Sequence, residues 1–259
     1  MIKGIIQTFR KQYPLYLIEA AGLGFFMVSA CLFTILLEHP DFKLIHLIPS
    51  PFVRRFLIGV AMGTTAMVII YSPMGKRSGA HINPSITLTM LLLRKISVTD
   101  VLFYILFQIM GGITGVLIVK LLFPSYLADP SIAYIATVPG KEGIINATIG
   151  ESLIAFIMMF TTLITSNIER TKNLTGVIAG ILIVCFVTFE APFSGFSMNP
   201  ARTLASAIPS GIWDFWYMYM VVPPVCMILA ALIYNLLFFK GEFNYLKHDL
   251  NPKPTVDTK

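Results

Sequence analysis

The chain has 259 residues, of which 56% are apolar and only 12% are charged, and its mean hydropathy is +0.78. A water-soluble domain of this size does not expose so much apolar surface, so the composition excludes one and indicates a polytopic membrane protein. The net charge of +6 is not gathered in one basic patch, because the lysines and arginines lie at the ends of apolar stretches. A role in setting membrane topology is therefore favoured over nucleic-acid binding.

Six apolar runs are long enough to cross the hydrocarbon core, which takes about 20 helical residues. The first has 23 residues and no cleavage site follows it, so we interpret it as a retained span and not as a secretory signal. The runs are continuous, without the alternation of a membrane β-barrel, and they predict an all-α fold. The six predicted spans are Leu15 to Leu37, Phe56 to Tyr71, Val101 to Phe123, Ile144 to Thr165, Leu174 to Ala191 and Phe215 to Phe239.

Two shorter apolar runs, Ile86 to Leu93 and Ala201 to Ile208, cannot cross the membrane alone. Each has eight residues, or about 12 Å of helix at 1.5 Å per residue. Each also follows an Asn-Pro pair, and Asn is a favoured N-cap while Pro is a favoured first helical residue. We predict two half-helices that enter the membrane without spanning it.

The segments before these half-helices are near copies of one another, Ser-Gly-Ala-His-Ile-Asn-Pro-Ser at 78–85 and Ser-Gly-Phe-Ser-Met-Asn-Pro-Ala at 194–201. Their offset is constant (199 − 83 = 116), as an internal duplication requires. The chain is thus predicted to be a single domain, residues 1–259, with one repeat at about 14–123, a second at about 144–240 and a polar tail at 241–259. Three spans per repeat invert the second repeat in the membrane, so the two half-helices meet near the midplane.

A helix start at mid-membrane leaves backbone N–H groups and the positive end of a dipole to be satisfied. Two such starts facing each other form a polar spot that repels cations and donates hydrogen bonds to a neutral solute. The predicted pore residues are the two Asn-Pro boxes: Asn83, Pro84, Ser85, Asn199, Pro200 and Ala201.

Several other polar residues fall within the predicted membrane region. Arg202 follows the second box, and we expect a pore-lining donor, with an arginine neutralised by a carboxylate as the alternative. Glu19 and Glu151 are expected to satisfy the backbone N–H groups of the re-entrant loops, as is Gln108, although proton coupling is the rival role for the carboxylates. His81 is expected to be a packed loop residue and not a pH switch.

The six spans, the two half-helices and both boxes, together with Arg202, resemble the major intrinsic protein family of aquaporins and glycerol facilitators. The resemblance implies a right-handed six-helix bundle that assembles as tetramers with one pore per subunit. It also implies an outer constriction, which counting from the boxes locates at Gly63, Val187, Phe196 and Arg202. The first two of these assume that no gap separates them from the boxes.

The function expected from this sequence is a passive channel for water and small uncharged solutes such as glycerol, urea or neutral metalloid hydroxides. The alternatives are a proton-coupled secondary transporter that uses Glu19 or Glu151, and a membrane scaffold with an occluded pore. We expect no enzyme activity and no metal or cofactor. Because most lysines and arginines lie on the side of the N-terminus, we predict cytoplasmic termini and a plasma or bacterial inner membrane.

Overall fold

The computed structural model describes residues 2–239, and this part of the chain is built from helices without a strand. Within it, six helices are long and apolar enough to cross a membrane. The long helices are α1 (Ile2–Glu38), α3 (Pro51–Tyr71), α6 (Val98–Leu122), α8 (Gly143–Asn167), α9 (Thr175–Phe189) and α12 (Trp216–Phe239). The short elements are α2 (Lys43–Leu47), α4 (Pro73–Ser78), α5 (Pro84–Leu92), α7 (Pro124–Ala128), η1 (Ala133–Ile135), η2 (Lys172–Leu174), α10 (Ala191–Ser194) and α11 (Pro200–Ser210).

The predicted fold class is confirmed, and both half-helices begin at the proline of their Asn-Pro pair. The main difference lies in α1, which begins at Ile2 and not near Leu15. The added segment mixes apolar residues with lysine, arginine and glutamine, which are good helix formers, so the helix continues past the apolar run on which the prediction was based and includes Pro14. The polar tail predicted at 241–259 lies outside the described residues.

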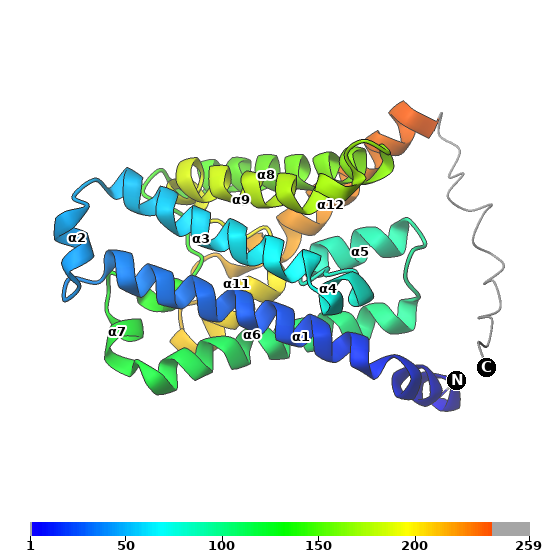
Figure 1. Cartoon of the computed structure of the whole chain (residues 1–259), viewed down its shortest axis with the longest axis horizontal. Coiled ribbons are helices and arrows are strands. Elements are labelled where there is room, and N and C mark those ends of the chain that lie inside the picture. The colour runs from blue at the N-terminus through cyan, green and yellow to red at the C-terminus, as the bar shows by residue number, and fades with distance from the viewer. Residues whose placement is uncertain (1, 240–259) are drawn as a thin grey trace.

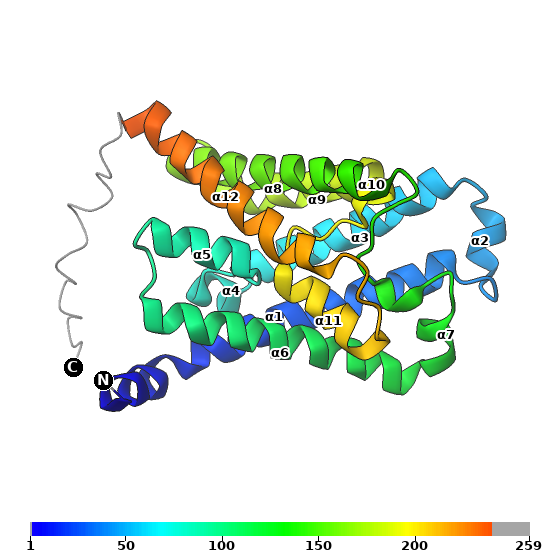
Figure 2. The same ribbon diagram turned by 180° about the vertical axis from the view of Figure 1, so that it is seen from behind.

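The six long helices form a bundle with the two half-helices at its centre (Figure 1). The start of α1 and the end of α12 lie at one end of the bundle, and α2 and α7 lie at the other. Half-helix α5 runs from the centre toward the first end and α11 toward the second, as both views agree (Figure 2). The two half-helices therefore enter from opposite sides, as an inverted repeat requires.

Each half-helix packs on the last span of the other repeat. Helix α5 contacts α12, and α11 contacts α6. The long helices also pair, α1 with α6, α3 with α9 and α8 with α12. The two repeats are thus interlocked through their half-helices, and neither forms a separate body.

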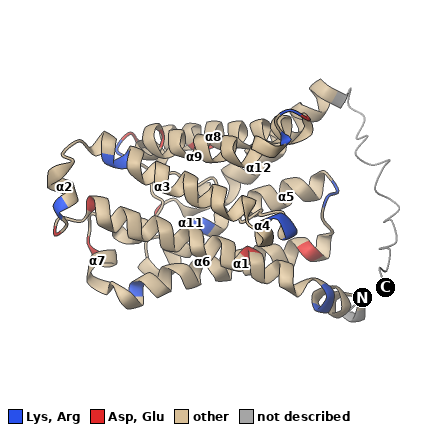
Figure 3. Cartoon of the chain, viewed as in Figure 1, with Lys and Arg blue, Asp and Glu red and all other residues tan. Residues whose placement is uncertain are grey.

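Most charged residues lie toward the two ends of the bundle, and a few lie near its centre beside α1 and α11 (Figure 3). Between these ends, large apolar side chains point outward, with Leu17 52% and Leu102 65% exposed. An apolar outer surface between two charged ends is what a lipid bilayer accommodates.

Helices α1 and α6 approach closely because glycines remove side chains from their contact. A Cβ atom at Gly111 of α6 would collide with the backbone of Ala20 in α1. On the other helix, a Cβ atom at Gly24 would lie 2.9 Å from the carbonyl oxygen of Gly111. The backbones therefore touch directly, which fixes Glu19 of α1 beside Gln108 of α6.

Gly111→Ala is expected to destabilise the protein by about 1–3 kcal/mol, because the added methyl group forces two backbones apart. Thermal unfolding of the detergent-solubilised protein measures the loss. Gly4→Ala is the matched control, since nothing lies within 4 Å of a Cβ atom there. Equal melting temperatures for the two variants would contradict the close packing.

Candidate functional site

The two re-entrant loops share one unusual backbone course. Each short helix ends at a left-handed glycine, Gly79 (φ 89°) or Gly195 (φ 78°). The next residue in each loop is also left-handed, at Ala80 (φ 46°) and Phe196 (φ 53°), and so is the residue before each asparagine. Left-handed backbone costs a non-glycine residue about 1–2 kcal/mol, so other contacts must hold the loops in place.

Glu19 supplies those contacts in the first loop. One carboxylate oxygen accepts hydrogen bonds from the Ser78 hydroxyl (2.7 Å) and the His81 N–H (3.0 Å). The other accepts from the Ile82 N–H (2.6 Å) and from the side-chain amide of Gln108 (2.8 Å). All four bonds are made by a carboxylate with no exposed surface, and two of them satisfy backbone donors that the bilayer cannot satisfy.

Glu151 does the same in the second loop. It accepts from the Ser194 hydroxyl (2.8 Å) and from the N–H groups of Ser197 (2.7 Å) and Met198 (2.8 Å). Both carboxylate oxygens of Glu151 thus accept hydrogen bonds from the second loop, as a carboxylate that supports the loop requires.

Sequence reasoning assigned no role to four further side chains that complete the supports. The Tyr104 hydroxyl donates to the carbonyl of Ser78, and the Tyr219 hydroxyl donates to the carbonyl of Ser194. Thr87 bonds to His81 (3.2 Å) and Gln108 (3.1 Å) in the first repeat, and Thr203 bonds to Ser197 (2.6 Å) in the second. The threonines follow the offset of 116, which could have identified them. The tyrosines are 115 apart, so a strict offset misses them.

The two asparagines hold the loops to each other. The Asn83 side-chain N–H₂ donates to the carbonyl of Met198 (2.9 Å), and that of Asn199 donates to the carbonyl of Ile82 (2.8 Å). Each side-chain oxygen caps its own half-helix, accepting from the N–H of Ser85 (2.8 Å) or Ala201 (3.0 Å). An amide has two N–H donors, so each asparagine keeps one donor beyond the bond described.

Arg202 lies in the first turn of α11 and is 6% exposed. Its Nε and Nη1 atoms are buried without a hydrogen-bond partner among residues 2–239. Buried donors of this kind normally bind a partner, which a passing solute can provide. The Ser85 hydroxyl is likewise buried without a partner in this part of the chain.

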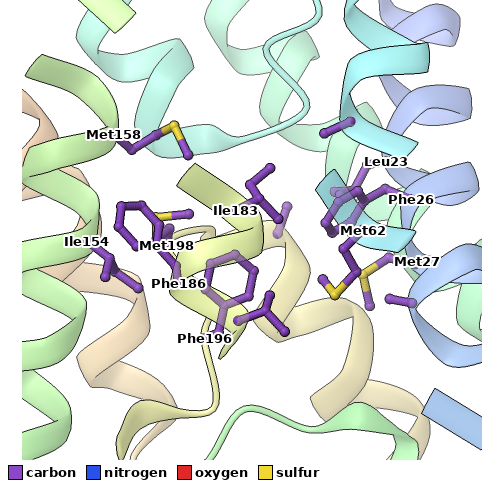
Figure 4. Close-up of a cluster of buried hydrophobic side chains, with 14 of the residues drawn as sticks. Leu23, Phe26, Met27, Met62, Ile154, Met158, Ile183, Phe186, Phe196 and Met198 are labelled. Atoms are coloured by element: carbon purple, nitrogen blue, oxygen red, sulfur yellow. The ribbon is translucent and has the colours of Figure 1, made fainter. Parts of the chain in front are cut away.

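The other three residues assigned by counting lie in different settings. Phe196 (4% exposed) and Val187 (5% exposed) belong to the central apolar cluster, in which Figure 4 shows Phe196. Gly63 instead faces α9, because a Cβ atom there would lie 2.5 Å from the carbonyl oxygen of Gly180 and 2.9 Å from Val184. The preceding residue, Met62, is 4% exposed and lies in the same cluster as Phe196.

These elements define a class of protein: a polytopic helical membrane protein in which two re-entrant half-helices meet at their positive ends. A model of the family described as "Major intrinsic protein" matches residues 14–234. The chain belongs to this family, whose members are channels and not enzymes. Among residues 2–239, no group of three histidine, cysteine or acidic side chains is placed to hold a metal ion.

Individual proteins similar to this chain are named as aquaporins. The chain is 33% identical over 186 residues to a putative aquaporin, NIP4-1, of Arabidopsis thaliana, a match that covers 71% of this chain and 64% of the relative. It is also 33% identical over 196 residues to aquaporin-4 of Bos taurus, covering 73% and 58%. The matches thus span less than two thirds of these relatives. An aquaglyceroporin structure from Plasmodium falciparum shares the fold, with a TM-score of 0.73, 19% identity, and coverage of 86% and 95%.

Glu151→Ala is expected to lower the free energy of unfolding by about 3 kcal/mol or more, because it leaves three buried donors unpaired at about 1–3 kcal/mol each. Thermal unfolding in detergent measures this loss. Glu142→Ala, which removes an exposed carboxylate, is the control. The support role would be wrong if both variants melted at the same temperature.

Proposed function

We propose that this protein is a passive channel for water and small uncharged solutes, such as glycerol, urea and neutral metalloid hydroxides, and that it excludes protons and ions. The observation that carries the proposal is the meeting of two half-helix starts at Asn83 and Asn199, each with a side-chain N–H left for a permeating oxygen. A solute that accepts hydrogen bonds from these N–H groups regains the hydrogen bonds to water that it loses on entering the pore. A cation meets the positive ends of two helix dipoles and the Arg202 guanidinium.

A proton-coupled transporter is the weaker alternative. It would need Glu19 or Glu151 to bind and release protons during each cycle. All the carboxylate oxygens of this pair accept hydrogen bonds from the re-entrant loops. Protonation would remove hydrogen-bond acceptors that hold the re-entrant loops in place. Proton coupling through these residues would therefore disrupt the loops that line the proposed pore.

For the outer constriction we propose Met62, Val187, Phe196 and Arg202, with Met62 in place of Gly63. Gly63 has no room for a side chain because it faces the backbone of α9. Met62 is buried in the cluster that contains Phe196 and Val187. This set gives two apolar walls, one aromatic wall and one cationic donor, a ring suited to small solutes with both apolar and polar surface.

The setting proposed for the channel is a plasma or bacterial inner membrane, with cytoplasmic termini and four subunits that each contain a pore. The distribution of lysine and arginine supports the orientation. Family membership supports the tetramer. Chemical cross-linking of the purified protein in mild detergent tests the subunit number.

Stopped-flow light scattering on proteoliposomes tests the channel. An impermeant osmolyte is expected to cause shrinkage much faster than in protein-free vesicles, and glycerol or urea is expected to be followed by fast re-swelling. Fast shrinkage without re-swelling would restrict the channel to water. Shrinkage at the lipid rate, or accumulation of solute driven by a proton gradient, would refute a passive channel.

Met62→Ala is expected to raise the ratio of glycerol flux to water flux, because it widens the constriction, and Met62→Trp is expected to lower it. The same vesicle assay measures both fluxes. Val60→Ala on the exposed face of α3 is the matched control. An unchanged ratio in both Met62 variants would remove this residue from the constriction.

Arg202→Val is expected to increase proton leakage at near-normal water flux, because it removes a fixed positive charge from the pathway. A pH-sensitive dye inside the vesicles reports the leak. Leakage equal to that of the unaltered channel would show that Arg202 is not part of the barrier.

A further inference from the structure

Glu190 stands at the junction between the outer end of α9 and the second re-entrant loop. It follows the membrane-spanning part of α9, which ends at Phe189, and precedes α10. The equivalent residue of the first repeat is Met74 (190 − 116 = 74), which is 64% exposed. The two loops otherwise share their supports, so Glu190 is an acidic group that only the second loop has at this position.

Both carboxyl oxygens of Glu190 are buried without a hydrogen-bond partner among the described residues. The nearby Ser194 hydroxyl has a single proton, which it donates to Glu151 (2.8 Å). A carboxylate that is buried without donors is strongly destabilised, so this site favours the neutral acid.

The carboxyl group occupies a notch left by a glycine. A Cβ atom at Gly150 of α8 would collide with Oε1 of Glu190. The notch therefore accepts a carboxyl group only because residue 150 has no side chain. Through this contact, the start of the second loop is docked on α8, next to Glu151.

The titratable groups that face Glu190 are Glu151 from α8 and Tyr219 from α12. Burial and, after it, the charge of Glu151 raise the pKa of the Glu190 carboxyl to about 8. Its protonation therefore changes between neutral and mildly alkaline pH.

We propose that Glu190 is a proton-operated switch of the second re-entrant loop, an inference that rests on the channel function proposed above. The neutral acid docks in the Gly150 notch and holds the loop in its conducting course. The ionised acid leaves the notch for water, and the loop that positions Phe196 and Arg202 loses one of its contacts with α8 while it keeps those with Glu151. Conduction is high when Glu190 is protonated and falls when it is ionised.

Water permeability of proteoliposomes, with the same pH on both sides, tests the switch between pH 6 and pH 9.5. The unaltered channel is expected to lose permeability by about thirtyfold, following the protonated fraction of the group. Glu190→Gln keeps the shape and cannot ionise, so its permeability should stay at the pH 6 level throughout. Glu142→Gln, at an exposed glutamate, is the matched control and should behave like the unaltered channel.

Gly150→Ala fills the notch and should give low permeability already at pH 6. Gly4→Ala adds the same methyl group in open space and should not. The switch is overturned if the unaltered channel keeps its permeability over the whole pH range, if Glu190→Gln loses it as the unaltered channel does, or if Gly150→Ala conducts normally with an unchanged pH profile.

Thermal unfolding tests the same switch without relying on permeation. Because the folded pKa is raised, the stability from neutral Glu190 is fully present below the pKa of an unfolded glutamate, near 4.3, and is lost as the pH rises through about 8. The melting temperature should therefore fall more between pH 6 and pH 9.5 for the unaltered protein than for Glu190→Gln. The switch would be overturned if the melting temperatures of the two proteins changed with pH in parallel. If the melting temperatures diverged but the vesicles showed no permeability at any pH, only the channel function would be refuted.

Discussion

The structure depends on one constraint: two helices begin in the middle of a membrane, where no water satisfies their backbone. The protein meets this constraint by joining the two starts through the amides of Asn83 and Asn199, each donating to a carbonyl of the opposite loop. These bonds cross between the repeats. Neither loop can keep its course if the other is absent, so the central polar site exists only in the complete fold.

The surrounding helices supply the contacts that stabilise the two re-entrant loops. Left-handed residues bring the loop N–H groups to face Glu19 and Glu151, and each carboxylate in turn replaces the water those groups lack. Close contact of α1 with α6, made possible by Gly24 and Gly111, brings Gln108 to Glu19. The central polar site is thus maintained by acceptors and glycines that lie around it on the neighbouring helices. The proposed exclusion of cations and the proposed hydrogen bonding to neutral solutes both rest on the same helix ends.

Much of this was accessible from the sequence. Six long apolar runs predicted the spans, and the two short runs that follow the Asn-Pro pairs predicted the half-helices. The constant offset of 116 indicated a duplication, and three spans per repeat predicted its inversion. Counting along the chain locates a constriction residue only if no residue is inserted, because one insertion rotates the assigned position by about 100° on a helix of 3.6 residues per turn. In the structure Gly63 faces α9, and Met62 lies in the cluster with Phe196, so we propose Met62 for the constriction. The tyrosine supports and the notch that receives Glu190 arise from tertiary packing, which no local pattern records.

The most direct test of the account measures water and proton movement in the same proteoliposomes, with scattered light reporting volume and an enclosed dye reporting pH. Two opposed helix starts with fixed positive ends predict water flux far above that of the lipid control, with proton flux equal to it. Proton flux that rises together with water flux would contradict the account, because it would mean that the site at Asn83 and Asn199 conducts charge.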